Sequence, residues 1–151
     1  MEIKAYRIRN AIFWTLVVIF AALVGGIIKR WMFWGHRMPL WGFAVIAIVF
    51  CTLAVALLVL TLKLKEHGLR KWFFMITGIS AAGIPIFAIL HNVIYGLLIF
   101  LFGKEFWGKG GDEPVFFILA IIVFPALFVI GMLGSIVTLL FGRLRKKNIA
   151  C

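Results

Sequence analysis

Four long apolar stretches, separated by short basic segments, organise this chain. The first two cover residues 11–28 and 40–62, and the last two cover 72–102 and 115–141. None of the four stretches contains a charged side chain. An α-helix rises 1.5 Å per residue, so about 20 apolar residues cross a hydrocarbon layer roughly 30 Å thick. The pattern therefore predicts four transmembrane helices.

The third stretch allows two arrangements. Its 31 residues would form a straight helix about 46 Å long, too long for one simple crossing and too short for two. One arrangement is a single long helix that bends near Pro85, and we favour it slightly. The other is an interfacial helix over about 69–82, followed by a span from Ile84. In the second arrangement His91 lies near mid-membrane, whereas a long straight helix moves it towards the far leaflet.

Composition supports a membrane fold and leaves no room for a second domain. The chain has 151 residues, of which 65% are hydrophobic and only 14% are charged. A soluble domain of this size has too little interior to bury so many apolar side chains. We therefore predict an all-α integral membrane bundle of four helices, with residues 1–151 forming one domain.

The net charge of +11 is more informative about the orientation of the protein in the membrane than about its binding partners. Counted on alternate sides of the predicted spans, eleven Lys and Arg residues lie beside the termini and the second connector, against five on the other side. We therefore predict a protein of the cell membrane, and the positive-inside rule places both of its termini in the cytoplasm. These cations are expected to meet anionic headgroups, and no basic face interleaved with aromatics indicates nucleic-acid binding.

Aromatic and basic side chains near the ends of the spans are expected to anchor the protein at the headgroups. Tryptophan rings favour the interface, and long cationic side chains reach from it into water. The predicted anchors are Trp31, Trp34, Trp41, Trp72, Arg143, Arg145, Lys146 and Lys147.

The fourth helix has a clear start signal. Asp112 and Glu113 are suited to cap its unpaired N–H groups and to favour its positive end. Pro114 fits the first turn, where an N–H is not needed. A bend is expected further on, at Pro125.

The third stretch also carries the strongest candidate for a functional site. With His91 at 0° on a helical wheel, Tyr95 lies at about 40° and Asn92 at about 100°, so the three share one sector. His91 is the only titratable side chain that the pattern places deep within an apolar span. Facing lipid would be costly, so the sector is expected to face protein or water. It either joins neighbouring helices by hydrogen bonds or lines a cavity or proton-coupled path.

Catalytic and cofactor chemistry find little support in these residues. One membrane histidine is too few for haem held between facing helices, unless a dimer interface or a ligand such as Met75 or Met132 completes the site. The remaining acids have no metal-ligand spacing, and no intramembrane acid is present to orient His91 for hydrolysis. We therefore predict no cofactor and no metal.

Every predicted span carries small residues four positions apart, which let helices approach closely in lipid. These pairs are Ala21/Gly25, Ala22/Gly26, Ala47/Cys51, Thr52/Ala56, Gly78/Ala82 and Gly131/Ser135. Packing within the chain is the favoured explanation, with a homodimer or a larger membrane complex as the alternative.

The function predicted from sequence is non-catalytic: an accessory, partner-binding or packing role in the membrane. The alternative is an oligomeric transporter or channel component that uses the sector of His91, Asn92 and Tyr95. A membrane enzyme or electron carrier is the least favoured of the three.

Overall fold

Each apolar stretch becomes a helix because, in lipid, a helix pairs its own backbone N–H and C=O groups. The computed structural model describes residues 2–32, 40–103, 105–108 and 113–149. Its elements are α1 (Glu2–Met32), α2 (Leu40–Lys63), α3 (Leu69–Phe102), α4 (Pro114–Ile118), the π-helix η1 (Leu119–Val123) and α5 (Phe124–Ile149). Four helical segments are long and apolar enough to cross a membrane, which confirms the predicted all-α four-helix fold.

The third stretch is one helix. α3 runs without interruption for 34 residues from Leu69 to Phe102, through Pro85. The prediction of a single long helix is therefore correct, and an interfacial helix followed by a separate span is wrong. A proline inside a membrane helix removes one hydrogen bond, and packing against neighbouring helices tolerates that loss. Pro85 is buried against such neighbours.

The fourth span contains a π-helix beside its proline. α4, η1 and α5 follow one another directly, and η1 ends just before Phe124 and Pro125. The N–H of Phe124 donates to the carbonyl of Leu119, five residues earlier. Pro125 has no N–H and cannot continue the α-helical hydrogen-bond ladder, so the adjoining turn widens.

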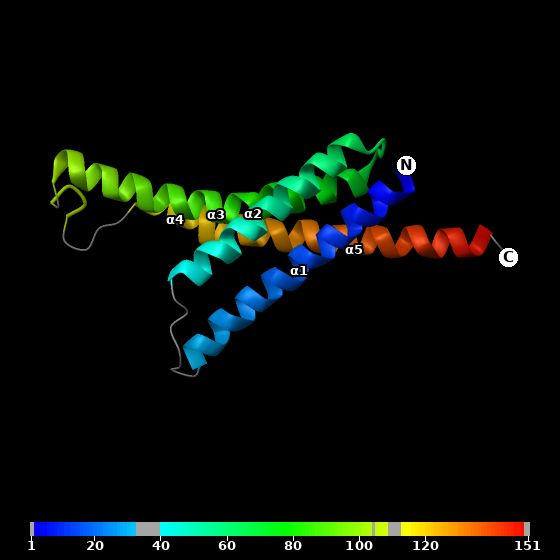
Figure 1. Ribbon diagram of the computed structural model, residues 1–151, viewed down its shortest axis with the longest axis horizontal. Coiled ribbons are helices and arrows are strands. Elements are labelled where there is room, and N and C mark those ends of the chain that lie inside the picture. Colours follow the sequence, from blue (N-terminus) through cyan, green and yellow to red (C-terminus); the bar gives the residue numbers. More distant parts are fainter. Residues whose placement is uncertain (1, 33–39, 104, 109–112, 150–151) are drawn as a thin grey trace.

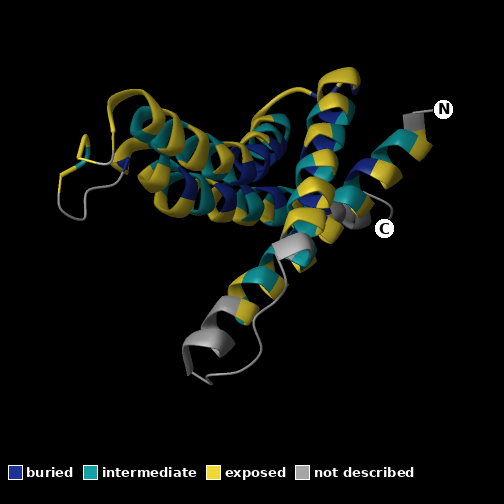
Figure 2. Cartoon of the chain, turned by 60° about the vertical axis from the view of Figure 1, so that its left-hand side comes forward, coloured by how far each residue is buried: buried dark blue, intermediate teal, exposed yellow. Residues whose placement is uncertain are grey.

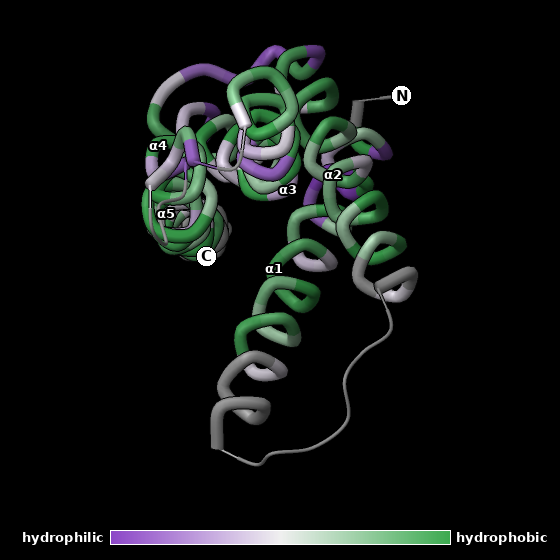
Figure 3. The backbone as a smooth tube through the Cα atoms, turned by 90° about the vertical axis from the view of Figure 1, so that its left-hand side faces the viewer, coloured by the Kyte–Doolittle hydropathy of each residue, from purple (hydrophilic) through white to green (hydrophobic). Residues whose placement is uncertain are grey.

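The helices form two hairpins that cross obliquely. The start of α1, the end of α5 and the turn between α2 and α3 lie at one end of the molecule, on the right in Figure 1. α3 is central, because it packs against α5 on one side and α2 on the other, whereas α1 joins mainly through α2. In Figure 3, α3 and α5 are seen nearly end-on while α1 runs away from them.

The core lies where the hairpins cross. All four spans contribute to it, mainly through phenylalanine and small residues, and Figure 2 shows the buried positions there in dark blue. Ring contacts join distant parts of the chain, with the centroids of Phe20 and Phe128 4.4 Å apart and those of Phe13 and Phe74 5.1 Å apart. The buried members are Phe13, Leu16, Phe50, Ala54, Leu57, Phe74, Ala81, Ala82 and Phe128.

Glycines let α3 approach α5 closely. A Cβ atom added at Gly131 would lie 2.7 Å from the backbone nitrogen of Thr77, and one at Gly134 would lie 2.2 Å from the ring of Phe73. At Gly83 the added atom would lie 2.5 Å from the ring of Phe124. The small residues of α3 and α5 are therefore used for packing within the chain.

Candidate functional site

The imidazole of His91 joins α3 to the start of α4. Its Nδ1 atom lies 3.0 Å from the backbone oxygen of Glu113 and 3.4 Å from that residue's Oε2. Since a carbonyl only accepts hydrogen bonds, the shorter contact requires a proton on Nδ1. The His91 side chain is 14% exposed. It therefore faces protein.

Glu113 caps α4 with both oxygens of its carboxylate. Oε1 accepts from the backbone N–H of Val115, and Oε2 from that of Phe116, each at 2.9 Å. Pro114 occupies the first turn, as its fixed φ favours. Asp112 lies outside the described residues. The carboxylate thus satisfies two unpaired donors and also meets the His91 ring, which ties the helix start to α3.

Asn92 and Tyr95 have different surroundings. Asn92 is exposed, and its Nδ2 donates to the Ala88 carbonyl of its own helix at 2.8 Å. The Tyr95 ring stacks between His91, at 6.4 Å between centroids, and Trp107, at 6.1 Å. The three residues therefore do not share one environment. His91 and Tyr95 face the connection between α3 and α4, whereas Asn92 is exposed.

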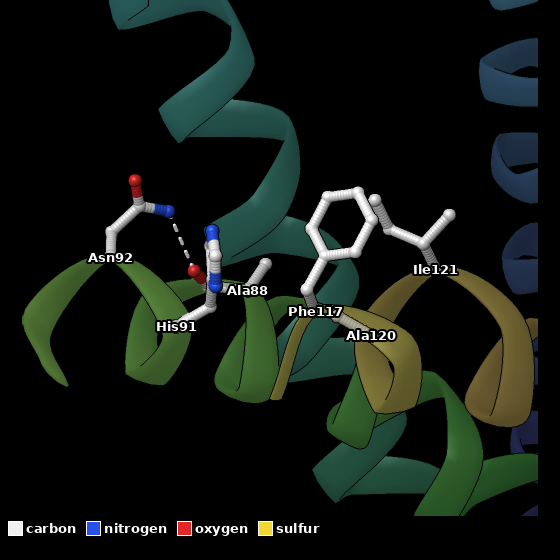
Figure 4. Close-up of a pocket in the computed structure, with 6 residues that line it drawn as sticks. All are labelled: Ala88, His91, Asn92, Phe117, Ala120 and Ile121. Carbon is white, nitrogen blue, oxygen red and sulfur yellow. Dashed lines mark hydrogen bonds between the residues drawn. The ribbon is translucent and has the colours of Figure 1, made fainter. Parts of the chain in front are cut away.

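A pocket of about 270 Å³ lies beside this contact, between α3 and the start of the fourth span. In Figure 4 the side chains of His91, Phe117 and Ile121 extend to the same side of the two helices. The lining residues are Ala88, His91, Asn92, Phe117, Ala120 and Ile121. The walls are largely apolar, with polar groups concentrated on α3.

The single-helix geometry fixes how far His91 lies from the start of α3. Arg70, in the first turn of α3, is 21 residues before His91. At 1.5 Å per residue the separation along the helix is about 31 Å, which matches the hydrocarbon thickness. If Arg70 lies at one boundary of that layer, His91 lies at the opposite boundary and not at mid-membrane.

The structure contains a second polar cluster that the sequence pattern did not indicate. Arg9 is completely buried, and its guanidinium contacts the carboxylate of Glu66, which also contacts Arg70. The guanidinium also lies over the Phe74 ring, 4.0 Å from its centroid. Arg9 and Glu66 lie outside the four apolar stretches, so buried titratable groups are not confined to the span that carries His91.

The sequence signal for this cluster was weak. Arg9 and Glu66 are 57 positions apart, in segments that read as solvated basic connectors. Only the packing of α1 against the turn before α3 brings them together. Glu113 is buried too, at 5% exposure, because the cap closes against His91.

The predicted anchors are only partly described. Trp72 is 63% exposed near the start of α3, and its role as a headgroup anchor stays a prediction. Trp34 lies outside the described residues. The structure describes only the helical backbone, and not the side chains, of Trp31, Trp41, Arg143, Arg145, Lys146 and Lys147.

The described residues offer no group of three or more His, Cys, Asp or Glu side chains placed to hold a metal ion. Comparisons with protein-family models, curated proteins and solved structures find no match.

Removing the carboxylate of Glu113 is expected to destabilise the protein. The Glu113→Ala variant loses two capping hydrogen bonds and the contact with His91, so we expect a loss of about 1 to 2 kcal/mol. Detergent-unfolding titrations of the purified protein measure it. Glu105→Ala, an exposed acid in the same connector, is the matched control and should change little. Equal stability of the two variants would show that the cap contributes nothing.

Proposed function

We propose that this is a non-catalytic multi-pass membrane protein that acts by binding another transmembrane helix through the part of α1 around residues 21–26. One observation carries the proposal. Outside α1's own backbone, no described atom lies within 4 Å of a Cβ atom added at Gly25 or Gly26. Their counterparts Gly83 and Gly131 are tightly packed. Gly25 and Gly26 thus form a small-residue face of α1 that no described part of the chain covers.

The surroundings of this face support the proposal. Ala21 and Ala22 are exposed one turn before the two glycines, in a stretch without charge. Small residues at this spacing allow close approach of two backbones in lipid, where hydrophobicity alone does not drive association. A second copy of the chain is the simplest partner, because a two-fold symmetric interface needs only one self-complementary surface.

Several hydroxyl groups in the spans are bonded within their own helices. Hydroxyls donate to carbonyls of their own helix, as in Thr61 to Leu57 at 2.7 Å and Ser80 to Ile76 at 2.6 Å. This use of the polar side chains favours a non-catalytic role. The Lys and Arg distribution supports both termini in the cytoplasm of a cell with an anionic inner leaflet.

Filling the open face is expected to abolish self-association without harming the fold. In the double variant Gly25→Leu and Gly26→Leu, the added side chains meet no described neighbour, so the melting temperature should stay within a few degrees of the parent's. Native mass spectrometry in mild detergent should show a dimer for the parent and a monomer for the variant.

The control is Gly96→Leu, since Gly96 also has open space but lies on α3. It should leave the dimer intact. A monomeric parent protein, or a dimer that survives the double substitution, would contradict the proposal.

A transporter or channel component is the second candidate, and the pocket beside His91 and Asn92 favours it. A proton- or solute-dependent flux into liposomes, lost in a folded His91→Ala variant, would establish this function. A parent protein that carries no flux would exclude it.

A further inference from the structure

One carboxylate near the start of α3 serves two guanidinium groups. One oxygen of Glu66 contacts Arg9, and the other contacts Arg70. The three side chains together therefore carry one net positive charge. Arg9 is completely buried, whereas the Arg70 side chain is 34% exposed. Of the two guanidiniums, only that of Arg70 can thus meet an anion from outside.

The Arg70 guanidinium is held in place and has hydrogen-bond donors to spare. A guanidinium carries five N–H donors in a planar fork, and the contact with Glu66 is made through Nη2. The Nη1 atom lies beside α5, 3.7 Å from the position of a Cβ atom added at Gly142. A fork fixed in this way loses little further freedom when it binds two oxygens of one phosphate.

The surroundings of Arg70 add positive charge. The start of α1, the turn between α2 and α3 and the end of α5 lie together in Figure 1. The first turn of α3 also contains Lys71 and no acid, although the positive end of a helix favours acids. Glu66, buried in the cluster, is the only acid among the side chains that the structure describes at this end. The exposed cations here are Lys4, Arg7, Lys63 and Lys65.

Exposed apolar side chains lie beside these cations. Leu69 is 71% exposed and Trp72 is 63% exposed, on either side of Arg70 and Lys71 in the sequence. Such a mixture suits the boundary between hydrocarbon and headgroups, where acyl chains and phosphates lie close together. The anion that fits this surface therefore belongs to a lipid, whose chains can pack against Leu69 and Trp72.

We propose that Arg70 holds the phosphate of one anionic lipid in a discrete site at the start of α3. The phosphate accepts hydrogen bonds from the guanidinium donors that Glu66 does not use. With one monoanionic phosphate diester bound, two anions balance the two guanidiniums of the cluster. A discrete site differs from the diffuse attraction of headgroups to a basic surface, and it is independent of helix binding through α1.

Native mass spectrometry of the full chain in mild detergent tests the choice of lipid. Phosphatidylglycerol should saturate a first site at one lipid per chain. It should bind at least about tenfold more tightly than phosphatidylcholine with the same acyl chains, because the neighbouring lysines repel the choline cation. Glycerophosphoglycerol, the same headgroup without chains, should not displace it at equal concentration. Equal affinity for the two lipids, or displacement by the soluble headgroup, would overturn the proposal.

Arg70→Gln tests the guanidinium itself. Glu66 keeps its contact with Arg9 in this variant, so the protein should fold. Binding of phosphatidylglycerol should weaken at least about tenfold, as expected when hydrogen bonds to a charged group are lost. The matched control is Arg7→Gln, which removes the same charge from an exposed position at the same end and should keep most of the affinity. Equal losses in the two folded variants would mean diffuse attraction and overturn the site.

A measurement on the parent protein decides if Arg70→Gln does not fold. A phosphatidylglycerol analogue with a diazirine close to its phosphate should label peptides that contain residues 65–73, as located by mass spectrometry. Labelling confined to other parts of the chain would refute the site.

Discussion

Replacing Glu66 with alanine is expected to destabilise the folded protein by about 3 to 5 kcal/mol, the usual cost of removing one partner from a buried ion pair. Glu66 is 8% exposed and contacts both Arg9, which is fully buried, and Arg70. Without the carboxylate, Arg9 keeps a positive charge among apolar side chains such as Phe74. Unfolding titrations in mixed detergent micelles measure the loss of free energy.

The control and a second variant make this prediction specific. Lys65→Ala removes an exposed charge from the same turn and should change stability by less than about 0.5 kcal/mol. Adding Arg9→Met to Glu66→Ala should recover much of the loss, because the buried charge disappears with its partner. A Glu66→Ala protein as stable as the Lys65→Ala protein would show that the cluster does not hold α1 to α3.

Gly131→Ala is expected to cost about 1 to 3 kcal/mol, because it overfills a closely packed helix contact. The added methyl group would lie 2.7 Å from both the backbone nitrogen and the Oγ1 atom of Thr77. A backbone atom cannot rotate aside as a side chain does, so α5 must move away from α3. The same unfolding titrations measure the effect.

Gly96→Ala is the matched control, since nothing described lies within 4 Å of its added methyl group. Alanine favours a helix over glycine by up to about 1 kcal/mol, so this variant should be as stable as the parent or more stable. Loss of stability at Gly96 equal to that at Gly131 would mean that close packing is not the cause.

The two polar clusters lie near opposite ends of α3. Arg9, Glu66 and Arg70 join α1 to the start of α3, and His91 with Glu113 joins the far part of α3 to α4. Each cluster pairs groups that would be costly alone in lipid. Together they hold the first and last spans to the central helix, whereas Gly25 and Gly26 of α1 have no described atom within 4 Å of an added Cβ.

Local patterns predicted part of the candidate site. The start signal around Glu113 and the unusual position of His91 are properties of short stretches, and each residue could be named from its neighbours in sequence. That His91 and Glu113 touch could not, because 22 positions and a connector separate them. Asn92 shared a predicted sector with His91, yet its amide bonds to its own helix and lies at the pocket's rim.

The sequence by itself determined the class of fold: four apolar stretches of membrane length must become helices, because lipid offers no other partner for the backbone. It also located the residues around which a site would form. The tertiary structure alone decided that α3 is one helix, that His91 meets Glu113, and that Arg9 is buried against Glu66. These outcomes depend on packing between segments far apart in the chain, where the free energy of a contact is set by both surfaces and cannot be read from either one.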